Sequence, residues 1–403
     1  MTVSRELDIV LLGATGYTGF LCAEHITKTC PTTLKWAIAG RSPTSIEAVS
    51  ERLKAISKDH VEIVHLNAID LDRLASKTRV VINTIGPFSR FSGPIIEACA
   101  KNGTHYVDTT TETLWIKEMI DKYHSTAVRT GVKIIPSISL SSSPSDLLAW
   151  LSATEIKERT GSGTAEIIAS GKLELSGMSG GSLASVIAVR EKYGSSWFLS
   201  GDSSILSPNL KQRRTTTSCL TRIFGYRHVP GLGMLTTSFV SPGNESVVLR
   251  SAALDPSLYG PNFNYSEYLP ASNIFAAILI HILTNIFNAL LAFPLFRRIL
   301  ERLAPEPGSG PDLVKAGEEE SAEFKAMGIS EDGKVKVGSR WWWKGSGYEV
   351  SALLAVEAAG VLVGWSKEEK GSGNGGILTP SHLGMEFVER LRKVGVVIEF
   401  EVL

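Results

Sequence analysis

Short apolar runs alternate with longer amphipathic segments over the first third of the chain. Short apolar runs are typical of strands buried on both faces of a parallel sheet, and apolar residues at helical spacing predict the segments between them. The expected strands are residues 9–12, 34–39, 61–66, 80–85, 105–108 and 132–135. This alternation predicts an α/β fold whose first part is a Rossmann doubly wound parallel sheet with right-handed crossovers.

The pattern becomes less regular after about residue 147. We expect strands at residues 165–174, 246–253, 335–343 and 396–402, and helices at 183–192 and 348–363. The chain is therefore predicted to contain a nucleotide-binding domain, residues 1–147, and a second α/β domain with a mixed sheet, residues 148–403. For the C-terminal helices within 348–395, packing back on the first domain is an open alternative.

The most apolar stretch, residues 274–296, lies inside the second domain and precedes Arg297, Arg298 and Arg302. Its length would suffice for a membrane span. The residues that interrupt or bend it are His281, Asn285, Asn288 and Pro294. One hypothesis is a buried or dimer-interface helix. The other is a helix on a membrane or lipid-droplet surface with the arginines at headgroup level.

A segment rich in Pro, Gly and Ser, residues 305–311, is followed by the acidic run 318–320. This composition predicts a mobile surface linker over residues 305–322. The basic run 211–214 is interpreted most simply as a solvated loop, with a contact to a phosphate-bearing ligand as the alternative.

A glycine-rich turn between the first strand and the first helix is the strongest functional signal. In DIVLLGATGYTGF, residues 8–20, Gly13, Gly16 and Gly19 are three residues apart. Strand, glycine-rich turn and helix in this order form a dinucleotide fingerprint, in which glycine permits the tight turn, the approach of a pyrophosphate and close helix packing. The alternative is a tight turn without a ligand. The candidate cofactor-binding residues here are Gly13, Thr15, Gly16, Tyr17, Thr18 and Gly19.

Arg41 and Ser42 follow the second strand, where a dinucleotide fold meets the adenosine ribose. An acidic residue there selects NAD, whereas a guanidinium can bind a 2′-phosphate through two hydrogen bonds. We therefore expect NADPH as the cofactor, the alternative being a surface arginine at a strand end. Asp70 is expected at the adenine edge.

The fourth strand ends in Asn83 and is followed by Gly86 and Pro87. In folds of this type, the corresponding turn normally lies beside the nicotinamide half of the cofactor. These three residues are therefore cofactor candidates, with an ordinary polar strand end as the alternative.

Charge and cysteine usage narrow the class of protein. Lys plus Arg and Asp plus Glu number 41 each, so the formal net charge is zero and a nucleic-acid partner is not expected. The eight histidines are scattered, which gives no support for a metal site. The cysteines lack C-x-x-C spacing, which favours thiols in a reducing compartment, and the N-terminus does not resemble a secretory signal. A cytoplasmic location is expected, with membrane or lipid-droplet association as the alternative.

Several ordered motifs resemble those of the saccharopine dehydrogenase-like oxidoreductases. They are GATGYTG at 13–19, AGRS at 39–42, VINTIGPF at 81–88, ACAKNGTHYVDTTTE at 98–112, SSSPSDL at 141–147, GGSLAS at 180–185, GSGY at 345–348 and GGILTP at 375–380. The resemblance implies an NADP-binding Rossmann domain followed by a second α/β domain that carries the substrate site. Some members resemble lysine-pathway imine reductases, and others resemble trans-acting enoyl reductases or lipid-droplet-associated proteins.

Two loops depart from the family pattern. The family's Asp-x-Thr-Gly-Glu has Thr111 in the glycine place, and its Gly-Phe-Asp-Ser-x-Pro-x-Asp has Ser139 for the glycine and Ser141 for the first aspartate. Both loops are expected where the substrate meets the nicotinamide. The cofactor half of the motif set is thus retained while the substrate half is altered.

We expect an NADPH-dependent reductase that acts on a C=C or C=N bond of a hydrophobic small molecule and forms a homodimer. The candidate catalytic residues are Glu112, Asp146 and Tyr17, with Tyr348 as a further proton donor or orienting group. The alternative for Asp146 is a helix N-cap. The rival functions are a redox-silent cyclase or isomerase on the same fold and a lipid-surface binding protein.

Overall fold

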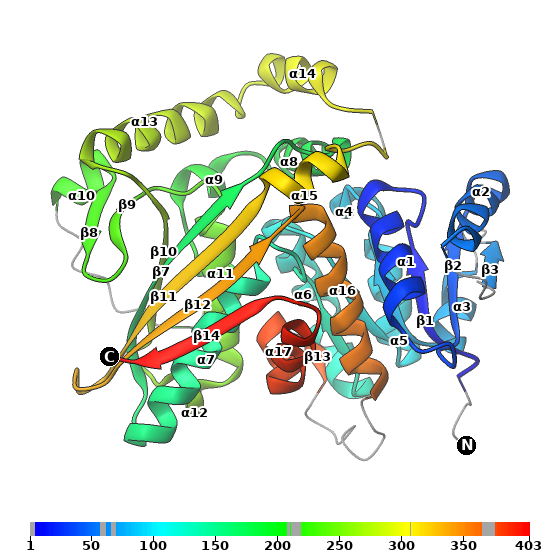
Figure 1. Ribbon diagram of the computed structural model, residues 1–403, viewed down its shortest axis with the longest axis horizontal. Helices are drawn as coiled ribbons and strands as arrows, with labels where there is room; N and C mark the ends of the chain where they lie inside the picture. Colours follow the sequence, from blue (N-terminus) through cyan, green and yellow to red (C-terminus); the bar gives the residue numbers. More distant parts are fainter. Residues whose placement is uncertain are drawn as a thin grey trace.

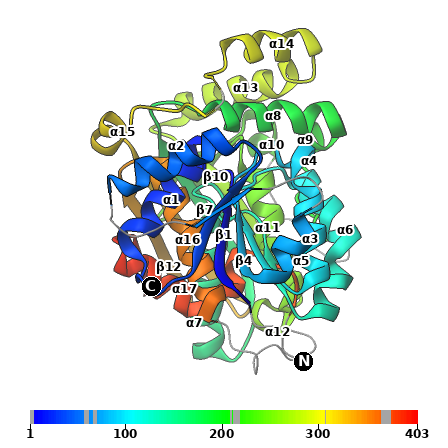
Figure 2. The same cartoon turned by 90° about the vertical axis from the view of Figure 1, so that its right-hand side faces the viewer.

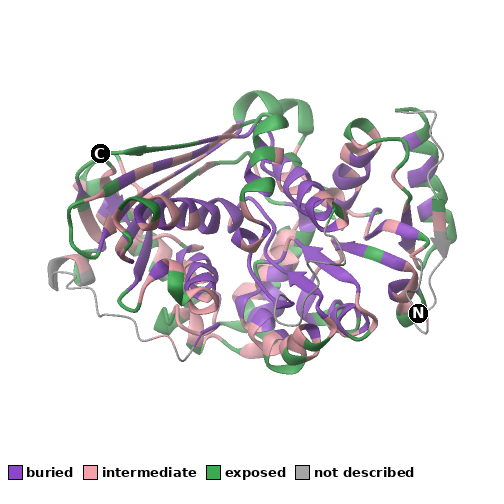
Figure 3. Cartoon of the chain, turned by 90° about the horizontal axis from the view of Figure 1, so that it is seen from below, coloured by how far each residue is buried: buried purple, intermediate pink, exposed green. Residues whose placement is uncertain are grey.

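The computed structural model describes residues 5–56, 62–65, 70–207, 210, 219–306, 308–364 and 375–403. Within these residues the chain forms two seven-stranded sheets that lie side by side (Figure 1). Buried residues are concentrated in the sheets and in the helices packed against them (Figure 3). The basic run 211–214 and most of the glycine loop 371–376 fall outside the described residues.

The first sheet is parallel throughout, with the order β13-β6-β5-β4-β1-β2-β3. Its strands are β1 (Leu7–Leu12), β2 (Trp36–Gly40), β3 (Glu62–His65), β4 (Thr78–Asn83), β5 (His105–Asp108), β6 (Lys133–Ile135) and β13 (Gly376–Ile377). The predicted Rossmann sheet is confirmed. The strand order reverses between β1 and β4, and a ligand is expected at this point, outside the carboxyl ends of the strands.

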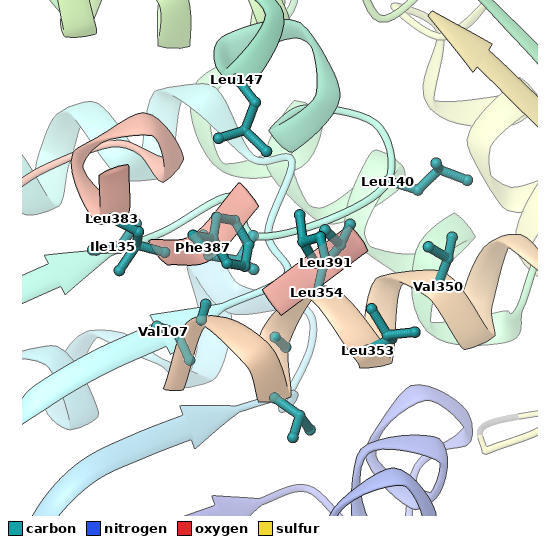
Figure 4. Close-up of a cluster of buried hydrophobic side chains, with 14 of the residues drawn as sticks. Val107, Ile135, Leu140, Leu147, Val350, Leu353, Leu354, Leu383, Phe387 and Leu391 are labelled. Carbon is teal, nitrogen blue, oxygen red and sulfur yellow. The ribbon is translucent and has the colours of Figure 1, made fainter. Parts of the chain in front are cut away.

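The helices of the first sheet come from both ends of the chain. The N-terminal ones are α1 (Tyr17–Thr29), α2 (Pro43–Lys54), α3 (Leu71–Lys77), α4 (Phe88–Phe91), α5 (Gly93–Asn102) and α6 (Thr113–Thr130). From the C-terminal part, α16 (Gly347–Gly364) packs along α1 and over β4 and β5, and α17 (Gly384–Lys393) packs against α16. Figure 4 shows Leu354 of α16 next to Leu391 of α17, in the same buried cluster as Val107 of β5. This packing brings the first turn of α16 to the glycine-rich turn.

The second sheet is mixed, as predicted, with the order β14-β12-β11-β7-β10-β9-β8. Its strands are β7 (Thr164–Glu174), β8 (Tyr226–Val229), β9 (Gly233–Thr236), β10 (Asn264–Pro270), β11 (Ser321–Ser330), β12 (Lys336–Lys344) and β14 (Val397–Val402). Only the β7–β10 pair is parallel among the described pairings. The long helix α7 (Ser143–Thr160) packs on β11, β12 and β7.

One predicted strand is wrong. Residues 246–253 lie inside the helix α11 (Ser241–Leu254). Val247, Val248 and Leu249 are all buried and no residue of α11 is exposed, so the helix is enclosed on several sides. A short apolar run of this kind cannot be assigned to strand or helix by periodicity alone. Further helices are α8 (Gly180–Tyr193), α9 (Ser196–Ser200), α10 (Cys219–Phe224), α12 (Pro256–Tyr259), α15 (Leu313–Glu319) and η1 (Pro380–Leu383).

The apolar stretch 274–296 forms α13 (Ile274–Leu290) and the start of α14 (Pro294–Leu303), which are bent by 102° relative to each other. Both helices lie along one edge of the molecule, beyond α8 (Figures 1 and 2). Among the α13 residues only Ala277 is buried, so the hypothesis of a helix buried in the core of the chain is wrong. The bent pair and α16 have the length and composition of membrane spans, but most of α16 is buried on the first sheet.

Candidate active site

The glycine-rich turn between β1 and α1 is tightly packed at two of its three glycines. Gly13 has a φ of +89°, and a Cβ on Gly19 would lie 2.1 Å from the carbonyl oxygen of Gly13. These two glycines are required by the turn itself. A Cβ on Gly16 would approach only that same oxygen, at 3.3 Å, so the turn leaves space beside Gly16.

The N-terminus of α1 provides a cradle for a diphosphate. Gly16 is the N-cap residue, no side chain caps the helix, and its first turn contains no acidic residue. The first N–H groups of a helix have no intrahelical acceptor, and the helix dipole favours an anion there. This arrangement, with the space at Gly16, fits the diphosphate of a dinucleotide.

Arg41 lies immediately after β2, at the carboxyl edge of the sheet, and is exposed. The next residue, Ser42, caps α2 by accepting a hydrogen bond from the N–H of Ser45 at 3.4 Å. The helix start therefore fixes the backbone at Arg41, and the guanidinium stays accessible to a ribose phosphate. Asp70 is the N-cap residue of α3, and its side chain does not cap that helix.

Replacing Arg41 with alanine is expected to weaken NADPH binding at least tenfold and to leave NADH binding nearly unchanged. Only NADPH carries the 2′-phosphate, and a charge-assisted bidentate contact is worth on the order of 1.5–3 kcal/mol. Titration calorimetry with both cofactors measures the effect. Arg129→Ala, an exposed arginine at the end of α6, is the control and should change neither affinity. An equal loss for both cofactors would contradict the assignment of Arg41.

Asn83 is buried at the end of β4, and its side chain is fully used in the turn that follows. Its amide donates to Ser92 Oγ at 2.8 Å and to the Tyr106 hydroxyl at 2.9 Å, and its oxygen accepts from the N–H of Ile85 at 3.1 Å. Asn83 therefore positions the turn that carries Gly86 and Pro87 and is itself enclosed by protein.

The Gly86 turn faces the second domain. A Cβ on Gly86 would lie 3.4 Å from Ser185 Oγ of α8, and α4 packs against α8. Gly86 and Pro87 are thus at the junction of the two sheets, on the carboxyl side of β4. This is the place that the sequence assigned to the nicotinamide half of the cofactor.

Glu112 is buried, and its carboxylate binds the start of α4. Oε1 accepts the N–H of Phe88 at 2.8 Å and Oε2 accepts the N–H of Ser89 at 2.9 Å. Both oxygens are occupied by backbone donors, which is the arrangement of a helix-capping carboxylate. The structure therefore gives Glu112 a positioning role at the Gly86 turn. Proton transfer by Glu112 stays a prediction for which the geometry offers no support.

Asp146 is also buried and joins three elements of the protein. Its Oδ1 accepts from Ser251 Oγ of α11 at 2.5 Å, and its Oδ2 accepts the N–H of Ser381 in η1 at 2.7 Å. Burial raises the pKa of Asp146 to about 6. The alternative of an N-cap does not describe this residue, because Ser142 occupies that position. The hydrogen bonds of Asp146 tie α7 to α11 and η1.

Asp108, which the sequence analysis did not select as a site residue, holds the carboxyl ends of β5 and β6 together. Oδ2 accepts from the Tyr106 hydroxyl at 2.7 Å, and Oδ1 accepts the N–H groups of Thr110 and Ser137 at 2.9 and 3.1 Å. Burial raises the pKa of Asp108 to about 7. Ser137 has a φ of +64°, a strained value for a residue other than glycine, of the kind that clusters at functional sites.

Tyr17 and Tyr348 meet above the glycine-rich turn. Their rings are 5.2 Å apart at 84°, in an edge-to-face contact. The Tyr348 hydroxyl accepts the N–H of Ser179 at 2.6 Å and donates to Ser182 Oγ at 3.0 Å, at the start of α8. The first turns of α1, α8 and α16 therefore converge here, although their residues are far apart in sequence.

Tyr17 also holds a segment that we call the strap, residues 308–312. Its hydroxyl donates to the carbonyl oxygen of Pro311 at 2.5 Å, and a Cβ on Gly310 would lie 2.7 Å from the Tyr17 ring. The N–H of Gly180 donates to the carbonyl oxygen of Ser309 at 3.3 Å. Burial, with a smaller contribution from Glu320, raises the pKa of Tyr17 to about 12. Tyr17 is thus a protonated contact between the turn and the strap.

Glu320 corrects part of the prediction of a mobile surface linker over residues 305–322. Its side chain is 1% exposed. Oε1 accepts the N–H and the hydroxyl of Ser176, at 2.8 and 2.5 Å, and Oε2 accepts the N–H of Gly347 at 2.8 Å. Gly347 is the first residue of α16, so its hydrogen bond to Glu320 also positions the next residue, Tyr348. This role of Glu320 could not be predicted from the sequence, because its partners Ser176 and Gly347 lie in other parts of the chain.

Within the described residues, no group of three His, Cys, Asp or Glu side chains could hold a metal ion. The polar groups described above at the carboxyl edge of the first sheet are the Arg41 guanidinium, hydroxyls, backbone N–H groups and buried carboxylates. This arrangement can bind a dinucleotide and can hold a proton on a tyrosine beside it.

Comparisons with known proteins agree with this geometry. Residues 9–135 match the family described as the saccharopine dehydrogenase NADP binding domain. A putative trans-acting enoyl reductase of Mycobacterium tuberculosis is 30% identical, and the alignment covers 98% of this chain and 97% of that protein. A trans-acting enoyl reductase of Mycobacterium ulcerans is 31% identical over 77% of this chain and 78% of the relative. The apo saccharopine dehydrogenase of Saccharomyces cerevisiae has a similar fold, with a TM-score of 0.50, 14% identity and coverage of 98% of this chain and 100% of that structure.

Proposed function

Because the chain belongs to the saccharopine dehydrogenase-like oxidoreductase family, we propose that it uses NADPH to reduce a carbon–carbon double bond in a hydrophobic small molecule. The family assignment makes the chain an NADP-dependent oxidoreductase. The choice of a C=C bond rests on one observation, the similarity to a putative trans-acting enoyl reductase along nearly the whole of both chains. That similarity includes the second domain, which is expected to carry the substrate.

The cofactor, when bound, supplies the hydride. The N–H groups at the start of α1 would hold its diphosphate, and Arg41 would bind its 2′-phosphate. The Gly86 turn, which Asn83 and Glu112 hold in place, would border its nicotinamide half. Each of these residues binds or orients, and none of them needs to change its protonation state.

Tyr348 is our candidate for the group that holds the transferred proton. Reduction of an enoyl group places negative charge on the conjugated carbonyl oxygen and requires a proton at the α carbon. The N–H of Ser179 donates into the Tyr348 oxygen and would stabilise that oxygen after its proton has left. Ser182 Oγ, at 3.0 Å, offers a path by which the proton is replaced. Tyr17 is less suited because its hydroxyl donates to the carbonyl oxygen of Pro311, an acceptor that has no proton to return.

Replacing Tyr348 with phenylalanine is expected to lower kcat for NADPH oxidation on the order of 100-fold, since a positioned acid contributes about 10²–10⁴. The affinity for NADPH should stay the same. Tyr17→Phe is the matched control, because it removes a hydroxyl from the neighbouring ring, and kcat should change less than tenfold. Stopped-flow absorbance with a hydrophobic enoyl thioester measures both variants. An unchanged kcat in Tyr348→Phe would exclude this residue as the proton donor.

A redox-silent cyclase or isomerase is the second candidate function. It is motivated by the two loops that depart from the family pattern, in which Thr111 stands in a glycine place and Ser139 and Ser141 replace a glycine and an aspartate. The two functions differ in their use of cofactor. A reductase oxidises one NADPH for each product formed, whereas an isomerase forms product with the NADPH absorbance unchanged.

A further inference from the structure

The bent pair α13–α14, which we call the apolar arm (Ile274–Leu303), presents large apolar side chains to solvent. On α13 these are Phe275, Leu279, Ile282, Leu283, Ile286 and Leu290, and beyond it Phe293, Leu295, Ile299 and Leu303. Phe275 is 80% exposed and Leu303 is 75% exposed. Their spacing of three, four or seven residues places them along one face of each helix. A contiguous apolar surface of this kind marks an interaction site.

The opposite face of α13 is fastened to the second domain. Thr236 Oγ1 donates to the carbonyl oxygen of Ala277 at 2.6 Å, and the Thr237 hydroxyl lies 2.7 Å from His281 Nδ1. Arg190 of α8 donates to Asn288 Oδ1 at 2.7 Å. His281 and Asn288, which interrupt the apolar sequence, thus make the contacts that fix the helix with its apolar face outward. A helix held in this way can lie on a surface, and it cannot cross a bilayer without breaking these contacts.

The arm is bordered by positive charge. Arg298 and Arg302 are exposed on α14, and with Leu295 and Ile299 they occupy one helix face at spacings of three and four residues. Arg297 points elsewhere, because it donates to the carbonyl oxygens of Leu291 and Ala292. Exposed apolar side chains with adjacent arginines are the pattern of helices that lie in the headgroup region of a membrane.

The apolar surface continues from the arm onto neighbouring elements. Leu199 of α9 and Ile223 of α10 are 59% and 65% exposed, and both helices pack against α13. Phe239 is 38% exposed, and its ring lies 5.6 Å from that of Phe287. In Figures 1 and 2, α13 and α14 lie along the same edge of the molecule. Because the exposed apolar residues are spread over several helices, this edge fits a broad surface better than a single inserted side chain or peptide.

We propose that the apolar arm docks the protein flat on an anionic lipid surface, with Arg298 and Arg302 at the lipid phosphates. Charge complementarity favours this partner over a second copy of the chain. In a two-fold dimer built on the arm, the same arginines from both copies would border one interface and repel each other. Glu301 is the sole acidic side chain of the arm that could offset this repulsion. The proposal is independent of the reductase activity, because it concerns a different surface.

Flotation of the full-length protein with vesicles tests the proposal. Wild type should float with phosphatidylcholine vesicles that contain phosphatidylserine, and less with pure phosphatidylcholine. Leu279→Asp with Ile286→Asp should reduce the bound fraction at least tenfold, because both side chains lie on the exposed face. Leu403→Asp is the matched control, since Leu403 is 60% exposed at the C-terminus, and it should float like wild type.

A second pair of variants tests the contribution of arginine charge to vesicle binding. Arg298→Gln with Arg302→Gln should weaken binding to anionic vesicles about tenfold or more at low salt, because each arginine near such a surface contributes roughly fivefold. Arg129→Gln with Lys334→Gln removes the same charge elsewhere and should have little effect. Wild type that stays in the soluble fraction with anionic vesicles overturns the proposal. Sedimentation that shows a dimer dissociated by the Leu279 and Ile286 changes, without vesicle binding, assigns the arm to a second copy instead.

Discussion

Replacing Gly16 with valine is expected to abolish NADPH binding in a protein that still folds. Gly16 has an extended backbone conformation that valine adopts readily, with φ −83° and ψ 165°. A Cβ there meets only the Gly13 oxygen at 3.3 Å, so a small adjustment accommodates it within the chain. The two γ-methyl groups would occupy the space that the diphosphate needs. Fluorescence energy transfer from the protein to bound NADPH should disappear, while the circular dichroism spectrum and Tm stay close to those of wild type.

The matched control is the same substitution at Gly19. A Cβ on Gly19 would lie 2.1 Å from the Gly13 oxygen and 2.6 Å from Thr84 Oγ1, so the turn itself must open. Gly19→Val is therefore expected to lower Tm substantially with or without cofactor. Retained NADPH binding in a folded Gly16→Val protein would show that the cradle at α1 is not the diphosphate site.

Replacing Glu320 with alanine is expected to lower the free energy of unfolding by about 3 kcal/mol and to reduce turnover. The change leaves the donors on Ser176 and Gly347 without their charged acceptor in a buried site. Since the Gly347 N–H begins α16, the ring of Tyr348 would lose its fixed position against Tyr17. Urea unfolding and steady-state kinetics measure the two effects.

Glu319→Ala is the control for Glu320→Ala. Glu319 is the preceding residue, its side chain is 59% exposed, and its contact with Lys315 is 3.8 Å long. Exposed pairs of this kind contribute about 0–1 kcal/mol. The two substitutions should therefore differ in stability by more than 2 kcal/mol, and only Glu320→Ala should change turnover. Similar small effects for both would contradict the positioning role of Glu320.

The parallel sheet and the glycine-rich turn could be predicted from sequence because both are local signals. Each strand is a short apolar run, and the turn is a motif with a fixed place between a strand and a helix. β13 could not be predicted, because two residues carry no periodic pattern and their pairing with β6 depends on the return of the chain. The error at α11 has a different cause. This helix is buried on several sides, so its apolar residues do not show helical periodicity.

The candidate site was harder to predict because the roles of its carboxylates depend on contacts distant in sequence. Glu112 binds backbone N–H groups more than twenty positions earlier, and Asp146 binds Ser381, 235 positions later. The sequence shows that a carboxylate is present at these positions. It does not show whether hydrogen-bond donors from elsewhere in the protein already bind its oxygens. Tyr348 was one of several candidates in the sequence, and only the packing of α16 along α1 brings it to Tyr17.

Isotope transfer from the cofactor to the product tests whether this chain reduces a C=C bond. Purified protein would be incubated with NADPH deuterated at either face of nicotinamide C4 and with a series of enoyl thioesters of increasing chain length. Mass spectrometry of the products then locates the label. The predicted result is one deuterium at the β carbon of a saturated product, from one face only and in proportion to the NADPH oxidised. A rearranged product without deuterium, formed while NADPH stays reduced, would contradict reduction of a C=C bond by this chain.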